Sequence, residues 1–298
     1  MKYTIVGCIT KYGIEQIKPF VESIEQSGFN GEKLMLVYDI SKETIEYLDS
    51  KGWLITQSEP QQHIILQRFR DMYALLQSYE TETDVIIWVD VKDIVFQKDP
   101  TEWLNTNMNK DILAFSESLK FGDEEWAKLN AGTSFPMEWE WLQNEEIYCA
   151  GTIVGKKEAI RDLFIDIYRW SLTTSNPEQL ADQAAYNIII HLNQFKDKVQ
   201  FVKQQEGINL VDSNAFEQQM EESTSQIVDV RTPEEYADGH ISNAVNMDVT
   251  ADGFESKIES LDFKLDNRYI LSSPYLDKGI VFDVEDKVYA IWKDEKYL

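Results

Sequence analysis

Two aspartates that follow an apolar run are the residues of this chain most suited to chemistry. Asp90 comes directly after the run Val85–Val89 (VIIWV), and Asp93 follows three residues later. A short run rich in β-branched residues predicts a buried strand, and polar chemistry in open α/β sheets gathers beyond the carboxyl ends of strands. Two carboxylates there would suit Mn²⁺ or Mg²⁺, which prefer oxygen ligands. The alternative is that Asp90 caps a turn or helix by accepting backbone N–H bonds.

The composition limits the partners of such a site. The chain of 298 residues has 28 Lys and Arg against 53 Asp and Glu, and its formal net charge is −25. This charge repels nucleic acids and anionic lipids, so we expect neither as a partner. A bound phosphate would need a metal ion or a local cluster of Arg, Lys and backbone N–H groups. The hydrophobic content of 43% is sufficient for a folded core.

The cysteines and apolar runs predict a cytoplasmic protein. Cys8 and Cys149 are the two cysteines, both lie in apolar runs, and they are too few for a disulfide framework. The first residues lead into a predicted strand without the charged and apolar regions of a signal peptide. No apolar run approaches the roughly 20 residues of a membrane span, so we expect no integral membrane contact.

Alternating strand and helix patterns predict the elements that position Asp90. We expect strands at 3–9, 33–39 and 53–55, and helices at 15–26, 41–48 and 64–79. Gly28 is expected to end the first helix in a left-handed conformation, and Ser41 to cap the second. The third helix carries Arg68 and Arg70 toward the Asp90 strand. This order is typical of a doubly wound α/β sheet.

The region after Asp90 continues the α/β pattern with one long interruption. We expect strands at 111–115 and 148–155, helices at 157–170 and 182–191, and a hairpin over 275–292 that turns at 285–286. Residues 119–146 are polar and rich in Trp. They would either cover a substrate or form a surface subdomain with Trp in its core.

The order of these segments resembles a known enzyme family. The segments GCITKYG, LVYD, QRFRDMYALL, WVDVKDIVFQKDP, AFSES, CAGTIVG and DQAAYN follow one another over roughly the first two thirds of the chain. They resemble nucleotide-sugar-dependent glycosyltransferases of the GT-A fold, and in particular a family with the metal motif Asp-x-x-Asp followed by Val-Phe-Gln-x-Asp-Pro. The resemblance implies a GT-A-like (Rossmann-like) mixed sheet flanked by helices.

The resemblance also assigns roles to individual residues. It implies that Thr10 and Tyr12 line the nucleotide pocket, and that Asp90 and Asp93 hold metal and ribose. The family's acceptor-side motif falls on Cys149, Gly151 and Gly155, and its donor-sugar motif on Asp182, Gln183 and Asn187.

Charge development during sugar transfer agrees with these roles. The leaving diphosphate gains negative charge, which Mn²⁺ or Mg²⁺ would stabilise with help from Arg68 or Lys92. Asp182 would act as a general base in an inverting reaction or as an electrostatic stabiliser in a retaining one. Its alternative role is the N-cap of the next helix. Arg70 is expected to be a solvated helix charge.

A second resemblance begins at residue 209. The segments VDVRTPEEY (228–236), GHI (239–241) and AVN (244–246) resemble the front half of a rhodanese domain. Sulfur transfer in that family requires a later Cys, and this chain has none after Cys149. We therefore expect a structural or interaction role and no sulfurtransferase activity.

The end of the chain bears on the metal site. In the glycosyltransferase family a similar hairpin leads to a His that completes the metal site, and the corresponding place here is near Lys293. No His follows it. Water, Asp294 or His191 are possible substitutes.

Three segments and one function follow from these patterns. We expect a GT-A-like domain at 1–208, a partial rhodanese-like segment at 209–262 and a tail with the hairpin at 263–298. The predicted function is metal-dependent transfer of a hexose from a nucleotide sugar donor to a glycan or other small acceptor. The alternatives are a catalytically impaired GT-A-like binding protein and a nucleotidyltransferase.

Overall fold

The computed structural model describes two units of the chain. The described residues are 1–78, 83–92, 94–96, 98–176 and 180–203, together with Pro233, Ala237 and the four short strands given below. One unit comprises residues 1–92 and 98–208, and the other comprises 93–97 and 209–298. Asp93 lies outside the described residues.

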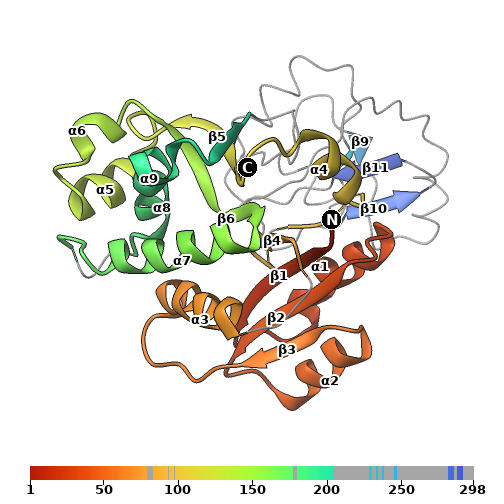
Figure 1. Ribbon diagram of the computed structural model, residues 1–298. Coiled ribbons are helices and arrows are strands. Elements are labelled where there is room, and N and C mark those ends of the chain that lie inside the picture. Colours follow the sequence, from red (N-terminus) through yellow and green to blue (C-terminus); the bar gives the residue numbers. More distant parts are fainter. Residues whose placement is uncertain are drawn as a thin grey trace. The chain divides into compact units, whose positions relative to one another are not determined.

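The described strands of the first unit form one mixed sheet (Figure 1). They are β1 (Tyr3–Thr10), β2 (Glu32–Tyr38), β3 (Leu54–Gln57), β4 (Val85–Val89), β5 (Ile112–Lys120), β6 (Glu146–Lys156) and β7 (Val199–Val202). Their order is β3-β2-β1-β4-β6-β5-β7. Strand β6 pairs antiparallel with β4 and β5, whereas the other described pairs of this sheet are parallel. The prediction of a mixed α/β sheet is confirmed.

Helices flank this sheet at nearly the predicted places. Those described are α1 (Ile14–Gln26), α2 (Lys42–Ser50), α3 (Ile64–Ser78), α4 (Thr101–Asn107), α5 (Glu125–Ser134), α6 (Trp139–Leu142), α7 (Lys157–Ser171), α8 (Asp182–His191) and α9 (Asn193–Lys196). The predicted ends of two helices are confirmed. Gly28 follows α1 with φ 77°, and Ser41 caps α2 by accepting a hydrogen bond from the Thr44 N–H. No described helix combines the length and apolarity that crossing a membrane requires.

An aromatic cluster fixes α3 and α7 against β4. The Trp88 ring of β4 lies 5.8 Å from the Phe69 ring of α3 and 5.1 Å from the Phe164 ring of α7. All three side chains are fully buried, and α3 and α7 pack together (Figure 1). Because Trp88 lies two residues before Asp90, the same packing positions the carboxyl end of β4.

The Trp-rich excursion is a small helical subdomain with its own core. Phe121, Phe135 and Leu142 are buried in that core together with residues of α8, and Trp139 and Trp141 pack against it. The structure therefore favours the subdomain interpretation of residues 119–146.

The second unit contains two strand pairs among its described residues. Strand β8 (Val228–Asp229) pairs parallel with β9 (Val245–Asn246), and β10 (Val281–Val284) pairs antiparallel with β11 (Lys287–Ala290). Val284 is paired with Lys287, so these two strands form the antiparallel pair expected of the predicted hairpin, whose turn at 285–286 lies outside the described residues. Lys293 and Asp294 lie outside the described residues.

Asn187 connects α8 to an irregular part of the sheet. The register of β5 on β6 shifts on both sides of Ser116, and there the Tyr148 backbone pairs with an amide of α8. The Asn187 Oδ1 accepts from the Tyr148 N–H at 2.8 Å, and its Nδ2 donates to the Tyr148 carbonyl at 2.8 Å. Asn187 is 0% exposed, so no water replaces these bonds.

We predict that Asn187→Ala destabilises the first unit by about 2–3 kcal/mol, because two buried backbone groups of Tyr148 lose their partners. Urea unfolding followed by tryptophan fluorescence measures the loss. The control is Asn144→Ala, at an exposed position, which should stay within about 0.5 kcal/mol of the wild type. Equal midpoints for both variants would show that Asn187 does not hold α8 on the sheet.

Candidate functional site

The carboxyl ends of β1 and β4 meet where the winding of the sheet reverses. From β1 the chain proceeds to β2 and β3 on one side, and α3 then returns it to β4 on the other side of β1. Ligands of open α/β sheets bind outside the carboxyl ends of strands at such a reversal. The register pairs Val6 with Trp88, so Cys8 comes level with Asp90, and the Asp90 N–H donates to the Gly151 carbonyl at 2.7 Å.

Arg68 joins two carboxylates at this place. Its Nη1 lies 2.7 Å from Asp90 Oδ1, and its Nη2 lies 3.2 Å from Asp182 Oδ2. The Arg68 and Asp182 side chains are each 12% exposed, and that of Asp90 is 40% exposed. The guanidinium carbon lies 5.0 Å from the Phe69 ring centroid and 5.5 Å from that of Trp88. An ion pair and aromatic contacts thus hold one cation beneath a partly open carboxylate.

Burial and charge act against each other in this group. Burial alone would lower the pKa of Arg68, but Asp90 and Asp182 raise it above the ordinary arginine value. Burial raises the pKa of Asp182, and Arg68 opposes that effect while Asp90 adds to it. Burial, opposed by Arg68, raises the pKa of the Cys8 thiol to about 12. Arg68 therefore remains charged, and Cys8 remains a neutral thiol at physiological pH.

Gly151 leaves room for the Asp90 carboxylate. A Cβ atom at residue 151 would lie 2.9 Å from Asp90 Cγ and closer still to Oδ2. Any side chain at residue 151 would displace the Asp90 carboxylate. This steric limit explains why a glycine occupies the position whose carbonyl accepts from the Asp90 N–H. Sequence reasoning placed Gly151 at the site, and the structure places it against Asp90.

The three predicted donor-sugar residues lie on the first turns of α8. Asp182 is the first helical residue, whereas the N-cap is Ala181, so the alternative N-cap role of Asp182 is wrong. The Gln183 Oε1 accepts from the Ala150 N–H at 3.1 Å. Its Nε2 donates to Glu117 Oε1 at 3.0 Å. Asp182 thus lies beside Arg68, Gln183 lies beside Glu117, and the buried Asn187 bonds to β6.

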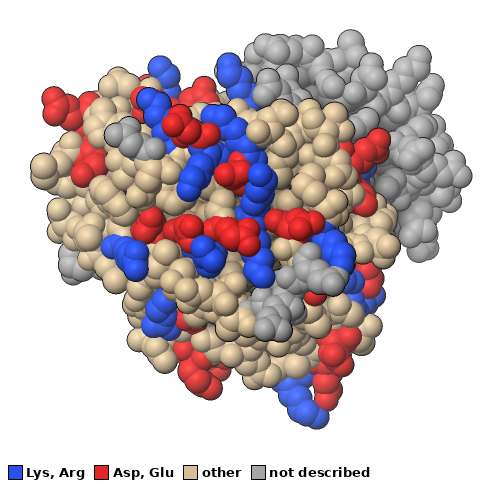
Figure 2. All heavy atoms as spheres, in the orientation of Figure 1, with Lys and Arg blue, Asp and Glu red and all other residues tan. Residues whose placement is uncertain are grey.

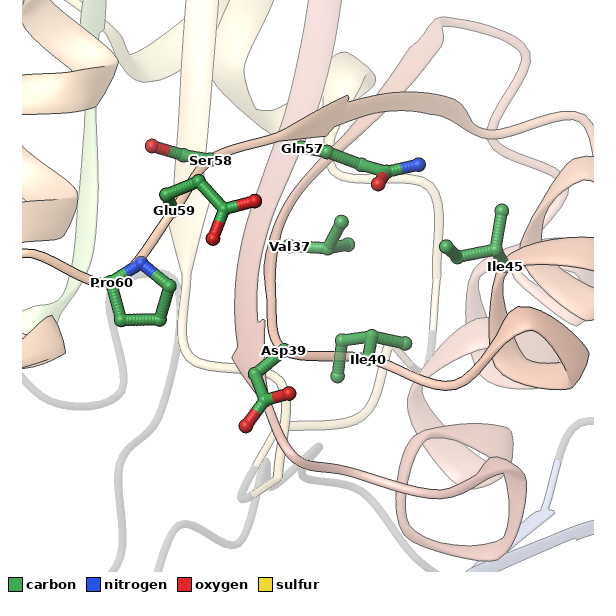
Figure 3. Close-up of a pocket in the computed structure, with 8 residues that line it drawn as sticks. All are labelled: Val37, Asp39, Ile40, Ile45, Gln57, Ser58, Glu59 and Pro60. Atoms are coloured by element: carbon green, nitrogen blue, oxygen red, sulfur yellow. The ribbon is translucent and has the colours of Figure 1, made fainter.

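Thr10 and Tyr12 lie at the end of β1, next to a hollow at the ends of β2 and β3. Thr10 is paired with Tyr38, and the Tyr12 carbonyl accepts from Thr44 Oγ1 at 3.4 Å. The hollow measures about 460 Å³. It is lined by Val37, Asp39, Ile40, Ile45, Gln57, Ser58, Glu59 and Pro60. In Figure 3 the carboxylates of Asp39 and Glu59 and the amide of Gln57 surround Val37. Thr10 and Tyr12 are thus neighbours of this hollow and not part of its lining.

Asp71 is a polar residue of α3 that the sequence analysis did not single out. It bonds α3 to residues at the hollow. Its carboxylate accepts from Tyr38, Ser58, Gln67 and Arg70 at 2.7 to 2.9 Å. Burial tends to raise the pKa of Asp71, but these hydrogen bonds lower it below its usual value. The Arg70 side chain is 31% exposed and paired with Asp71, so this charge is partly solvated and also bonded within the helix. The i, i+4 spacing of Gln67 and Asp71 was the available signal.

The described residues do not by themselves form a metal site. No three His, Cys, Asp or Glu within the described ranges are placed to hold one ion, and Asp93 lies outside those ranges. His191 is at the opposite end of α8 from Asp182, about 14 Å along the helix. Its Nδ1 lies 2.7 Å from the Asn187 carbonyl and its Nε2 lies 3.6 Å from Glu145, so His191 is not a substitute ligand beside Asp90.

The surface charges of the first unit are mixed. Figure 2 shows Lys and Arg interspersed with Asp and Glu on the visible face. Pairs such as Arg161 with Asp162 and Lys156 with Asp111 lie within 2.7 Å.

We predict that Arg68→Met destabilises the first unit by about 3–5 kcal/mol at pH 7, because two carboxylates lose their buried cation. The variant should raise the pKa of Asp182 further, since Arg68 is the group that lowers it. An acid with a raised folded pKa loses stability as pH rises from its unfolded value through its folded value. The deficit should therefore be smaller at pH 5 than at pH 7, as measured by thermal unfolding.

The matched control is Arg161→Met on α7, whose side chain is 32% exposed and forms a surface pair with Asp162. It should cost less than about 1 kcal/mol at both pH values. A pH-independent deficit in Arg68→Met would contradict the electrostatic account.

We also predict that Gly151→Ala lowers the melting temperature by displacing the Asp90 carboxylate from Arg68. Gly132→Ala is the control, because a Cβ atom there would meet only the Trp139 ring at 3.5 Å. Gly132 lies inside α5, where alanine favours the helix by roughly 1 kcal/mol. The two substitutions should shift the melting temperature in opposite directions, and a neutral Gly151→Ala would refute the steric argument.

The comparison with protein families identifies one segment of the chain. Residues 212–282 match the family model of the rhodanese-like domain. The match covers the predicted motifs at 228–246 and extends beyond residue 262 into β10. The matched segment contains no Cys.

A search of curated proteins finds no match to this chain. The chain therefore has a rhodanese-like segment at 212–282, preceded by an α/β unit with its own polar site at the reversal of the sheet.

Proposed function

We propose that the first unit is a GT-A-like glycosyltransferase that moves a hexose from a nucleotide sugar to a glycan or other small acceptor. The observation that carries this proposal is the bridge from Asp90 through Arg68 to Asp182 at the reversal of the sheet. Charged groups of both signs are held there beside an open carboxylate, as transfer from a diphosphate requires.

The hollow at the ends of β2 and β3 suits the nucleoside. Its volume of about 460 Å³ lies within the roughly 300–1,000 Å³ of small-molecule sites. Its lining is mostly polar, with apolar groups from Val37, Ile40 and Ile45, and Asp39 and Glu59 supply hydrogen-bond acceptors for a base or ribose. Strand β1 lies between β2 and β4 in the sheet. Thr10 and Tyr12 at its end would therefore contact a nucleotide that extends from the hollow to Asp90.

The Asp90 carboxylate fits a divalent cation. Arg68 holds Oδ1, and Gly151 leaves space around Oδ2. Asp90 would hold Mn²⁺ or Mg²⁺ together with Asp93, and the ion would supply positive charge at the leaving diphosphate. Arg68 orients Asp90 and adds a second positive charge. This charge matters because the chain as a whole is strongly acidic.

The residues of α8 and β6 would form the sugar side of the site. Asp182 is the residue that the family resemblance predicts to be catalytic. Its buried carboxylate holds Arg68 in place. The missing side chain of Gly151 allows the Asp90 carboxylate to lie against the backbone of β6. Gln183 and Asn187 bond to the backbone of β6 at Ala150 and Tyr148, so they would fix the shape of this wall.

The full chain should release nucleoside diphosphate from at least one of UDP-glucose, UDP-galactose and GDP-mannose when Mn²⁺ is present. Asp90→Asn should lower this release at least about 100-fold, because it removes charge from the metal and from Arg68. Coupled detection of the diphosphate measures it. The control is Asp49→Asn, at an exposed position of α2, which should leave the rate unchanged.

The alternatives predict different results in the same experiment. Binding of the nucleotides by calorimetry without any release would favour a non-catalytic binding protein. Pyrophosphate produced from a nucleoside triphosphate and a sugar phosphate would favour a nucleotidyltransferase. If the chain neither binds nor cleaves any of the three donors, the proposed function is wrong.

A further inference from the structure

A third carboxylate belongs to the same edge of the sheet. Strand β5 pairs antiparallel with β6, as β4 does, so the carboxyl ends of β4 and β5 lie at one edge. Glu117 lies in the irregular end of β5, between Ser116, at which the register shifts, and Ser118. Ser118 has φ 58°, which is rare for a residue with a side chain, and its N–H donates to Ser116 Oγ at 2.9 Å. Strained backbone of this kind is concentrated at functional sites.

Two side chains hold the Glu117 carboxylate. Gln183 donates to its Oε1 at 3.0 Å while accepting from the Ala150 N–H. The buried Cys149 thiol also forms a hydrogen bond with Glu117. The Asp90 carboxylate lies against Gly151, and Gln183 joins Glu117 to the Ala150 N–H, so the two carboxylates flank the same stretch of β6. Glu117 is therefore an oriented group next to the proposed sugar position, as a catalytic base must be.

Asp182 is less suited to accept a proton from substrate. Its side chain is 12% exposed and forms an ion pair with Arg68. Protonation of Asp182 would leave Arg68 with one carboxylate fewer inside the protein, which is costly. Glu117 is partly exposed and accepts a hydrogen bond from the Gln183 amide, so its carboxylate is more accessible than the buried carboxylate of Asp182.

We propose, on the basis of the glycosyltransferase function above, that Glu117 is the catalytic base and that Asp182 is a positioning residue that holds Arg68. The Glu117 carboxylate takes the proton of the acceptor hydroxyl. The acceptor oxygen forms a bond to the anomeric carbon, and the bond from that carbon to the diphosphate oxygen breaks. Its electron pair leaves with the diphosphate. Attack from the face opposite the diphosphate inverts the anomeric configuration.

The test uses the full chain with water as the acceptor. Hydrolysis of the donor that the wild type cleaves fastest should fall about 100-fold in Glu117→Gln, because the base is lost. The affinity for the corresponding nucleoside diphosphate, measured by calorimetry, should change less than threefold. The control is Glu140→Gln, an exposed glutamate of α6, which should retain the wild-type rate.

A pH profile separates proton transfer from a structural role. The wild-type rate should fall at acidic pH as the base becomes protonated, and Glu117→Gln should lack this acidic limb. The other titratable groups in this contact network are Cys149 on β6, Glu146 bonded to Ser116, Asp90 on β4 and Asp182 on α8. Asp182→Asn should therefore keep the limb while lowering the melting temperature. Glu117→Asp retains a carboxylate and should restore the limb at a reduced rate.

The outcomes distinguish this inference from the proposed function. A wild type that cleaves no donor overturns both. A wild type that cleaves a donor while Glu117→Gln keeps its rate or its acidic limb overturns only the role of Glu117. A limb that disappears in Asp182→Asn and persists in Glu117→Gln assigns the base to Asp182. Retention of configuration in the sugar product also overturns the inference.

Discussion

The contact of Arg68 with Asp90 and Asp182 is the interaction on which the site of the first unit depends. It links α3, the end of β4 and the start of α8 through one cation. A buried charge is tolerated only when it is paired and bonded, so none of the three residues can be replaced without affecting the other two. The ion pair of Arg68 with Asp90 uses Oδ1 of the carboxylate, and Oδ2 lies against the backbone at Gly151. Stability and readiness for a ligand therefore depend on the same contact.

The aromatic packing beneath Arg68 determines where that cation lies. Phe69 is the next residue of α3 after Arg68, and its ring packs against those of Trp88 and Phe164. This cluster fixes the rotation of α3 about its axis, and the rotation directs Arg68 toward the edge of the sheet. Asp71 lies one helical turn after Gln67 on the same helix. It secures α3 to the ends of β2 and β3 by accepting hydrogen bonds from Tyr38 and Ser58. A shift of α3 would alter the hollow at the ends of β2 and β3 and the Asp90 site together.

Local pattern determined most of the elements but not the contacts between them. The run before Asp90 is an uninterrupted buried strand, and α8 has the predicted bounds Asp182–His191, because apolar periodicity and length suffice for both. Arg68 is separated in sequence from Asp90 by 22 positions and from Asp182 by 114 positions. No short-range sequence pattern encodes contacts over such separations. The irregular end of β5 was likewise missed, because β-bulges depend on the partner strand. Glu117 was overlooked for this reason, although the segment AFSES that contains it contributed to the family resemblance.

The strong negative charge of the chain gives Arg68, which is a buried cation, its importance. In the proposed function, a diphosphate that approached this protein would meet a repulsive field, which a metal ion held by carboxylates would offset only in part. Arg68 is screened from solvent, so its charge acts at short range with little attenuation by water or salt. Asp182 retains that charge in a fixed position at the start of α8, and Gln183, the next residue of α8, donates a hydrogen bond to Glu117 at the end of β5. Burial thus distinguishes two carboxylates at this edge: Asp182 is buried in an ion pair with Arg68, whereas Glu117 is partly exposed.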